Sequence, residues 1–349
     1  METIIWNDSG AHVAVLGATG AVGREMLHCL EVLKMPVREL TLLASSRSAG
    51  KIMKTYMGDL PVCDASSFDF SGVDIVLCSA GKAVSIALAE KIIRAGALMI
   101  DNTSAFRRDA RYALVVPEVN GAQIELKPGI IANPNCSTIQ MVLALYALDQ
   151  AAELEDVRVC TYQSCSGAGQ KGMDALVNET RAALDGERPE HSAVHARTIA
   201  FDVVPQIGDI SENGFTEEEE KMMFETRRIL NRPDLKISAT CVRVPVMRAH
   251  SEVVHVTLRK SLSVAQAASI LDDMPGLRVT DRTDCHAYPT ATQAQGRFET
   301  LVGRIRKDPA SSNGLIFWIV SDNLLKGAAL NAVQIACAAW ELGRKAFHE

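Results

Sequence analysis

The chain reads Gly17-Ala18-Thr19-Gly20-Ala21-Val22-Gly23 where an apolar run, His12–Leu16, meets a segment with helical spacing, 21–33. This order of strand, glycine-rich turn and helix is typical of a dinucleotide-binding fold. Glycines let the backbone approach a pyrophosphate, which then lies at the N-terminus of the helix. A glycine-rich turn can also be purely structural. The flanking segments nevertheless favour nucleotide binding, with Gly17 and Gly20 in the turn itself.

The segment after the next expected strand, 40–44, distinguishes NADP from NAD. NAD-binding folds usually carry Asp or Glu about 20 residues past the glycines, where it holds the ribose hydroxyls. This chain instead has Ser45-Ser46-Arg47-Ser48. A guanidinium with neighbouring hydroxyls can bind a 2′-phosphate, which a carboxylate would repel. We therefore expect NADP(H) as the cofactor, although serine-rich loops with arginine are also common as solvated turns.

Short apolar segments alternate with helical segments up to about residue 135. Strands are expected at 74–79, 97–100 and 129–132, and a helix is expected at 83–95. Strands of this kind, separated by helices, predict a parallel sheet covered on both faces.

The pattern changes after about residue 155, where apolar and polar residues alternate. The alternation appears in segments 157–162, 238–244, 251–258, 300–305 and 314–320. It predicts a mixed or antiparallel sheet with one covered face. An alanine-rich helix, expected at 323–347, would pack back on the first domain.

The sequence therefore predicts an α/β fold with two domains. The first is a discontinuous Rossmann-type NADP-binding domain, 11–135 and 322–349. The second is an α+β substrate and dimerisation domain with a mixed sheet, 136–321. A length of 349 residues is compatible with two domains.

Asn135-Cys136-Ser137 places a cysteine where an expected strand, 129–132, runs through Pro134 into a helix. Free N–H groups and the helix dipole favour a thiolate at a helix N-terminus, and the thiolate is the nucleophilic form of cysteine. A buried structural cysteine is the alternative, because free cysteines are among the most buried residues. Local sequence alone does not separate the two.

Composition and charge narrow the class of protein. The net charge of −6 argues against nucleic acid or an anionic membrane as a partner. The sequence has no apolar run of about 18 residues and no secretory signal at its N-terminus, so no membrane segment is expected. Nine cysteines without C-x-x-C pairs indicate free thiols in a reducing cytoplasm and no zinc site.

Several further motifs appear in order and together resemble the aspartate-β-semialdehyde dehydrogenase family. They cover nearly the whole chain, leaving out about the first ten residues. Besides 17–23 and 45–50, the motifs are Asp101–Arg107, Val116–Asn120, Asn133–Thr138, Tyr162–Gln163, Ser166–Gly169, Val204–Gly208, Arg243–Pro245 with His250, Ser321–Leu325 and Gly327–Ala329.

This resemblance implies a role for each matching position. Cys136 would be the nucleophile that forms an acyl thioester, and His250 would be the acid/base. Substrate would be bound by Gln163, which orients it, Arg243 on its α-carboxylate, Glu218 on its amino group, and Arg107 with Lys221 on its phosphate. NADP(H) would be contacted by Thr19, Gly20, Ala21, Val22, Arg47, Ser48, Ser166, Gly167 and Asn323.

The chemistry of these residue types agrees with such roles. Arginine suits a bidentate carboxylate contact, and arginine with lysine suits a phosphate. Asn135, beside the nucleophile, would contribute a donor where an oxyanion develops. Taken singly, His250 also reads as a polar loop residue, Arg243 as a surface charge, and Glu218 as part of a solvated helix start, because acids favour the first turn.

The resemblance implies NADPH-dependent reductive dephosphorylation of L-aspartyl-4-phosphate to L-aspartate-4-semialdehyde. This reaction lies in the aspartate pathway to lysine, threonine, methionine and diaminopimelate. The resemblance also implies a homodimer or homotetramer. A related acyl-phosphate reductase, such as N-acetylglutamyl-phosphate reductase, a glyceraldehyde-3-phosphate dehydrogenase, or a non-catalytic nucleotide-binding homologue, remains the alternative. The reactivity of Cys165, two residues from Gln163, stays open.

Overall fold

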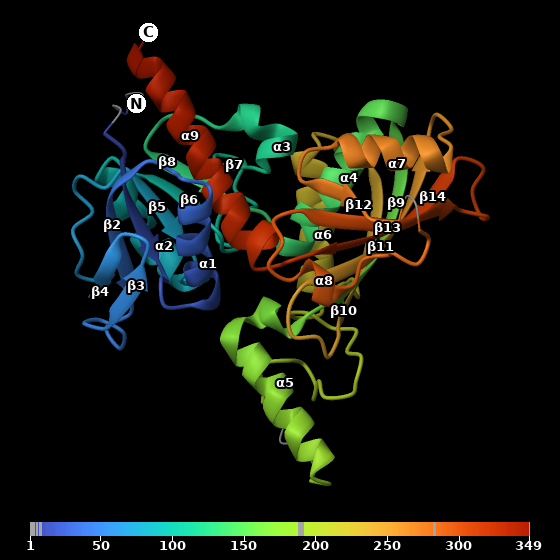
Figure 1. Cartoon of the computed structure of the whole chain (residues 1–349), viewed down its shortest axis with the longest axis horizontal. Helices are drawn as coiled ribbons and strands as arrows, with labels where there is room; N and C mark the ends of the chain where they lie inside the picture. The colour runs from blue at the N-terminus through green and yellow to red at the C-terminus, as the bar shows by residue number, and fades with distance from the viewer. Residues whose placement is uncertain (1–3, 5, 7–8, 188–191, 282–283, 349) are drawn as a thin grey trace. The chain divides into compact units, whose positions relative to one another are not determined.

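A computed structural model describes residues 4, 6, 9–187, 192–281 and 284–348 of the chain (Figure 1). The chain divides into two compact units. Unit 1 comprises residues 1–134 with 328–349, and unit 2 comprises residues 135–327. The domain limits expected from the sequence, at 135/136 and 321/322, remain a prediction about folding domains.

Unit 1 is built on a sheet with the strand order β3-β4-β2-β1-β5-β6-β8-β7. Its strands pair in parallel, except for the antiparallel pair β3 and β4 at one edge. Its elements are β1 (Ala11–Leu16), α1 (Ala21–Val32), β2 (Val37–Ala44), β3 (Ile52–Thr55), β4 (Gly58–Asp64), β5 (Ile75–Cys78), α2 (Lys82–Arg94), β6 (Leu98–Asp101), β7 (Ala113–Leu114), α3 (Pro117–Asn120), β8 (Gly129–Ala132) and α9 (Leu330–His348).

The strand order of unit 1 reverses at β1. The chain goes from β1 to β2 on one side, and β5 lies on the other side of β1. A reversal of this kind opens a crevice at the carboxyl ends of the strands, where ligands of parallel sheets bind. The predicted parallel sheet is therefore confirmed, and the glycine turn that follows β1 lies at the edge of the sheet where a nucleotide is expected.

Unit 2 contains a mixed sheet with the strand order β10-β9-β11-β14-β13-β12. Buried and exposed residues alternate along β9 and β10, as expected for a sheet with one covered face. Its elements are α4 (Cys136–Ala152), β9 (Leu154–Gln163), α5 (Gly169–Leu184), α6 (Glu217–Ile229), β10 (Lys236–Arg243), β11 (His250–Leu258), α7 (Val264–Asp273), β12 (Leu277–Val279), α8 (Ala291–Ala294), β13 (Thr300–Lys307) and β14 (Gly314–Ser321).

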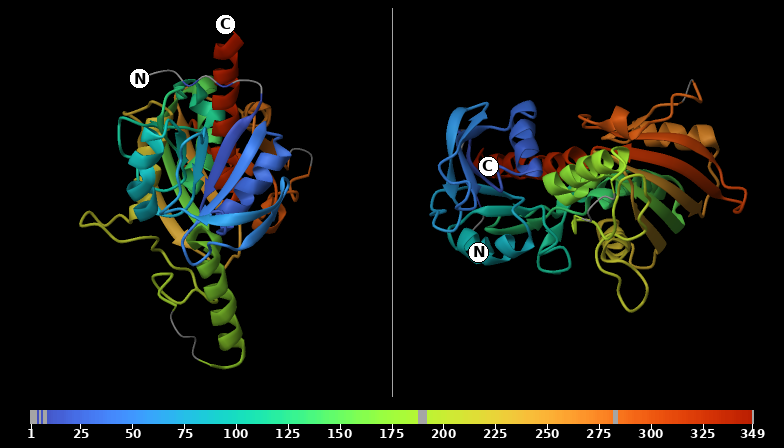
Figure 2. Two further views of the ribbon diagram at one scale, coloured as in Figure 1. Left: turned by 90° about the vertical axis from the view of Figure 1, so that its left-hand side faces the viewer. Right: turned by 90° about the horizontal axis from the view of Figure 1, so that it is seen from below.

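The covered face of this sheet lies against α4. Most residues of α4 are buried, because the helix is apolar on nearly all sides and packs against β9, β11 and β14 as well as α6 and α7. In contrast, α5 projects away from the sheet of its own unit (Figures 1 and 2). Because α4 is packed on nearly all sides, the position of its N-terminus is well defined.

The last helix starts later than the sequence predicts. Instead of a helix from residue 323, the chain makes a turn at Asp322, then a π-helical turn, Leu325–Ala329, and α9 begins at Leu330. The Asp322 carboxylate accepts the backbone N–H groups of Leu324 and Leu325, which an unbroken helix would leave free at its start. Further along, α9 contacts α1, α3, β5 and β6 of unit 1, as expected.

Candidate active site

Cys136 is the first residue of α4, directly after the N-cap Asn135. The Asn135 side-chain oxygen accepts the backbone N–H groups of Ser137 and Thr138 at 3.0 and 3.2 Å. The predicted place of Cys136 at a helix N-terminus is therefore observed. The backbone at Gly327 passes close by, since a Cβ there would lie 2.8 Å from the Cys136 Cβ. Glycine at position 327 therefore allows this segment to pack directly against Cys136.

The buried carboxylate of Glu218 joins three of the predicted substrate residues. Its Oε1 accepts hydrogen bonds from Asn135 Nδ2 at 2.8 Å and Gln163 Nε2 at 3.2 Å. Its Oε2 lies 3.8 Å from Lys221 Nζ, one helical turn along α6. Two side-chain amides and one ammonium therefore hold a carboxylate in a fixed orientation beside the residue that precedes Cys136.

The local sequence explains why Glu218 and Glu219 are buried while Glu217 is exposed. Thr216 caps α6, and Glu219 completes a capping box by accepting the Thr216 N–H at 2.8 Å. Glu217 is exposed and pairs with Lys221 at 2.9 Å. Position 218 then faces the interior, so the acidic run is more than a solvated helix start.

Arg243 ends β10 and is 7% exposed. Its Nη1 donates to the carbonyl oxygen of Ser164 at 2.6 Å, and its backbone pairs with Val204. Gly167 lies against it, because a Cβ at 167 would be 2.8 Å from Arg243 Nη1 and 3.3 Å from His250 Nε2. One nitrogen of the guanidinium is therefore anchored by the Ser164 carbonyl. The absence of a side chain at Gly167 leaves space beside both the guanidinium and the His250 imidazole.

His250 begins β11 and is fully buried. Its Nδ1 lies 3.0 Å from both the backbone nitrogen and the hydroxyl of Ser164. Among the described residues, its Nε2 has no hydrogen-bond partner. Burial, and then the positive charge of Arg243, holds the pKa of His250 well below its ordinary value, so the ring is neutral near pH 7.

Three of the residues predicted to contact NADP(H) lie in two segments of unit 2. Ser166 and Gly167 lie in a short 3₁₀ turn, 165–168, after β9. Asn323 follows β14, and Ser166 Oγ donates to its side-chain oxygen at 2.8 Å. All three belong to unit 2, and Ser166 and Asn323 are almost fully buried.

Four of the other residues predicted to contact the cofactor line a cavity of about 680 Å³ in unit 1. Gly17, Thr19, Gly20 and Arg47 line it, while Ala21 and Val22 form the first turn of α1. Gly17 has φ +93°, and a Cβ on Gly23 would lie 2.2 Å from the Gly17 carbonyl oxygen, so the turn requires glycine at both. A turn of this shape, with an exposed arginine at its rim, fits a dinucleotide that carries a 2′-phosphate.

Two more predicted residues lie in unit 1. Ser48 donates its backbone N–H to Ser45 in the turn after β2, outside the lining of the cavity. Arg107 is 8% exposed and donates from Nη2 to the Asn102 carbonyl at 2.9 Å.

The structure places two acidic residues, which were not identified from the sequence, in notable positions. Asp64, at the end of β4, lines the cofactor cavity, and its carboxylate is held by Ser66 of its own turn. Glu252, two residues after His250, is fully buried, and neither carboxylate oxygen has a hydrogen-bond partner among the described residues. The position of a carboxylate at the end of a strand could have revealed Asp64. An acidic residue in an alternating strand gives no such signal for Glu252.

Replacing Glu252 with glutamine should make stability less dependent on pH. Burial, with a further contribution from the negative charge of Glu218, raises the pKa of Glu252 well above its ordinary value. The folded chain then keeps a proton that the unfolded chain loses, so the parent becomes less stable as pH rises above about 4.3. In urea unfolding at pH 5 and pH 8, the free energy of unfolding of the variant relative to that of the parent should be larger at pH 8. The exposed Glu155→Gln on β9 is the control, and a pH-independent difference would contradict the assignment.

None of the helices in the described part of the chain has the length and apolar character needed to span a bilayer. The same residues contain no group of three or more His, Cys, Asp or Glu side chains placed to hold a metal ion.

Comparison with known proteins identifies two matching family models. The semialdehyde dehydrogenase NAD binding domain matches residues 12–127, and the semialdehyde dehydrogenase dimerisation domain matches residues 145–326. The aspartate-semialdehyde dehydrogenase of Bacillus subtilis is 47% identical over 334 residues, which cover 94% of this chain and 96% of that protein. The aspartate-semialdehyde dehydrogenase of Aquifex aeolicus is 46% identical, with coverage of 94% and 97%.

Solved structures of aspartate semialdehyde dehydrogenases are also similar to this chain. The crystal structure of Vibrio cholerae aspartate semialdehyde dehydrogenase II complexed with ASA has a TM-score of 0.90 and 43% identity, over 94% of this chain and 98% of that one. The Candida albicans aspartate semialdehyde dehydrogenase with NADP has a TM-score of 0.72 and 26% identity, with coverage of 95% and 98%.

Proposed function

Because the chain belongs to the aspartate-semialdehyde dehydrogenase family, we propose that it converts L-aspartyl-4-phosphate, NADPH and a proton to L-aspartate-4-semialdehyde, phosphate and NADP. This is a step of the aspartate pathway to lysine, threonine and methionine, and to diaminopimelate. The observation that carries the proposal is the Glu218 carboxylate, which Asn135 and Gln163 hold beside the helix N-terminus that bears Cys136. A buried acid at this place suits the free ammonium group of an amino acid.

The other substrate contacts follow from the same set of side chains. Arg243, anchored at one nitrogen by Ser164, has further N–H groups for the α-carboxylate. Gln163 orients the acyl group, and Asn135 keeps both the helix cap and Glu218 in place. Lys221 and Arg107 bind the phosphate.

Covalent catalysis divides the reaction into two easier steps. Cys136, as the thiolate favoured at a helix N-terminus, attacks the acyl carbon, a C–S bond forms, and the phosphate leaves with the electron pair of the broken C–O bond. When bound, NADPH supplies the hydride that reduces the resulting thioester. The C–S bond of the thiohemiacetal then breaks, which releases the aldehyde and restores Cys136, with His250 as the acid/base group.

NADP(H) is held by the glycine turn and the rim of the unit 1 cavity. Gly17, Thr19 and Gly20 receive the pyrophosphate at the start of α1, together with Ala21 and Val22. Arg47 and Ser48 meet the 2′-phosphate. Ser166, Gly167 and Asn323 contact the nicotinamide half.

Replacing Arg47 with alanine should selectively weaken the use of NADP(H). A charge-assisted contact with a phosphate contributes roughly 1–2 kcal/mol when it is exposed, so the KM for NADPH should rise by about tenfold. Kinetics with NADH should hardly change, because NADH lacks the 2′-phosphate. The matched control is Lys51→Ala in the same exposed loop. If the parent used NADH as well as NADPH, the assignment of NADP would fail.

The main alternative is a related acyl-phosphate reductase such as N-acetylglutamyl-phosphate reductase. Its substrate carries an acylated amino group, which has no positive charge. The buried Glu218 carboxylate, which Asn135, Gln163 and Lys221 hold in place, would then face a neutral ligand group and gain no charge interaction from the substrate. This observation favours the free amino acid substrate.

The chain acts as a homodimer or homotetramer in the cytoplasm. The match of residues 145–326 to a dimerisation domain supports self-association. None of the nine cysteines, all of which lie in the described part of the chain, forms a disulfide, as is usual in a reducing compartment.

The deciding experiment is NADPH formation from L-aspartate-4-semialdehyde, NADP and phosphate. Strict dependence of the absorbance increase on all three components is expected. No signal from folded protein that binds NADP would reject the proposed reaction, and N-acetylglutamate semialdehyde in the same assay would test the alternative.

A further inference from the structure

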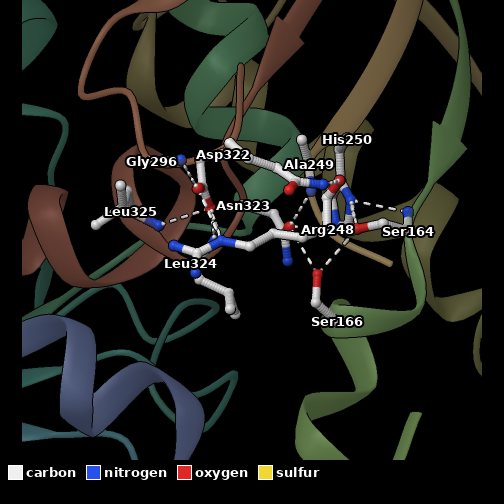
Figure 3. Close-up of polar contacts among 11 residues, drawn as sticks. Ser164, Ser166, Arg248, Ala249, His250, Gly296, Asp322, Asn323, Leu324 and Leu325 are labelled. Carbon is white, nitrogen blue, oxygen red and sulfur yellow. Dashed lines mark hydrogen bonds and ion pairs between the residues drawn. The ribbon is translucent and has the colours of Figure 1, made fainter. Parts of the chain in front are cut away.

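The hydrogen bonds around His250 determine which ring nitrogen carries the proton. A backbone N–H can only donate, and the Ser164 N–H points at Nδ1 from 3.0 Å (Figure 3). Nδ1 therefore presents its lone pair. In a neutral imidazole the proton then lies on the other nitrogen, Nε2. In an imidazolium, Nδ1–H would oppose Ser164 N–H, which disfavours the charged ring.

Asn323 organises the groups on this side of the ring. Its side-chain oxygen accepts hydrogen bonds from Ser166 Oγ at 2.8 Å, Ala249 N at 3.0 Å and Ser164 Oγ at 3.2 Å. Because the Ser164 hydroxyl is engaged by Asn323, the backbone N–H is the donor to Nδ1. The Asn323 side-chain oxygen thus positions both Ser164, which contacts the ring, and Ala249, which precedes His250.

The turn that precedes His250 has an unfavourable backbone conformation at Ala249. Ala249 has φ +76°, a region that residues other than glycine rarely adopt. Arg248, one residue earlier, donates from Nε to both oxygens of Asp322 at 2.9 and 2.8 Å. Asp322 is fully buried and also accepts the Gly296 N–H at 2.8 Å. Asp322 and Asn323 therefore clamp two successive residues ahead of His250 (Figure 3).

The opposite side of the ring faces the space beside Gly167. Nε2 lies there without a partner among the described residues, near Arg243 Nη1. Arg243 on β10 is the charged group that acts on the ring, whereas Ser164, Ser166 and Asn323 on the other side are neutral. The ring therefore offers a hydrogen-bond donor, Nε2–H, to a substrate group bound in the space beside Gly167.

We infer that Asn323 and Ser164 are positioning residues that hold His250 as a neutral ring with its proton on Nε2. His250 consequently enters the reaction as a hydrogen-bond donor through Nε2–H. This inference rests on the proposed function for its meaning in catalysis. When hydride adds to the thioester, Nε2–H donates to the oxygen that becomes negative. The C–S bond then breaks and its electron pair returns to Sγ, so the step balances without proton transfer.

The test is NMR of the full chain with ¹⁵N-labelled histidine, with and without NADP, because protonated and unprotonated ring nitrogens have distinct shifts. His250→Asn assigns the signal. At pH 7 the parent should show the proton on Nε2, and the ring should titrate only below the range of an ordinary histidine, because burial and Arg243 lower its pKa. A proton on Nδ1, or an imidazolium at pH 7, would overturn the inference.

Two variants separate positioning from a general structural role. Asn323→Ala removes the shared acceptor, so the ring signal should shift toward a mixture of tautomers and kcat should fall by about 10- to 100-fold. Asn323→Asp keeps the acceptor and should retain the Nε2–H tautomer, with a raised His250 pKa from the added charge. NADPH affinity is measured separately for both. An unchanged ring signal in Asn323→Ala would refute the positioning role, whatever its effect on stability.

The NMR result does not depend on turnover. An Nδ1–H ring in a protein that forms NADPH from the semialdehyde would reject this inference alone. An Nε2–H ring in a protein that fails that assay would reject the proposed function alone.

Discussion

Replacing Cys136 with serine should reduce kcat by at least about a thousandfold, the scale on which loss of a covalent nucleophile acts. Serine keeps the size of the side chain and the N-cap geometry set by Asn135, but its hydroxyl does not ionise at neutral pH as a thiol can. NADPH binding, followed by fluorescence, should persist because the cofactor cavity lies in unit 1. The variant should also form no covalent adduct with aspartyl phosphate by intact mass.

Cys165→Ala is the matched control for this experiment. Cys165 is buried two residues from Gln163, and burial raises the pKa of its thiol to about 11. It is therefore a neutral thiol at pH 7, and its removal should leave turnover and adduct formation near those of the parent. Retained turnover in Cys136→Ser, or loss of the adduct in Cys165→Ala, would reject Cys136 as the nucleophile.

The sequence predicted those parts of the fold that local patterns control. The strand β1, the glycine turn and the start of α1 follow from apolar runs and glycine spacing, and all are present. The place of Cys136 at the N-terminus of α4 follows from Pro134 and the helical spacing after it, whereas the cap by Asn135 is seen only in the structure. The helix expected from residue 323 was displaced because the Asp322 carboxylate binds two backbone N–H groups and Arg248, and the latter contact joins segments 74 residues apart. No local pattern contains that information.

The same division holds for the candidate site. Taken alone, the run Glu217–Lys221 was typical of a solvated helix start. The burial of Glu218 depends on Asn135, 83 positions earlier, and on Gln163. Likewise, the sequence placed Asn323 near the cofactor through resemblance. Its contacts with Ser164, Ser166 and Ala249 arise only when β9, β11 and β14 pair side by side. The roles of these residues in catalysis remain predictions.

Arg243→Lys should lower kcat/KM for the semialdehyde by about 10- to 100-fold. Hydrogen bonds to charged groups contribute roughly 1.5–3 kcal/mol, and an ammonium cannot reproduce the planar fork that grips a carboxylate. The effect is sharpened here because Nη1 is already committed to the Ser164 carbonyl at 2.6 Å. A lysine ammonium would have to satisfy that carbonyl and the substrate carboxylate from a single nitrogen, so one of the two contacts should be lost.

The loss should appear mainly in the KM for the semialdehyde, since the α-carboxylate takes no part in bond making. Lysine preserves the positive charge near His250, so the pH dependence of kcat should be similar to that of the parent. Arg158→Lys on the neighbouring strand β9 is the control, because Arg158 pairs with Asp156 at the surface and its exchange should be silent. Equal kinetics for Arg243→Lys and the parent would mean that the carboxylate is bound elsewhere. A pH profile that changes while KM stays constant would instead make Arg243 a modulator of His250 and no substrate ligand.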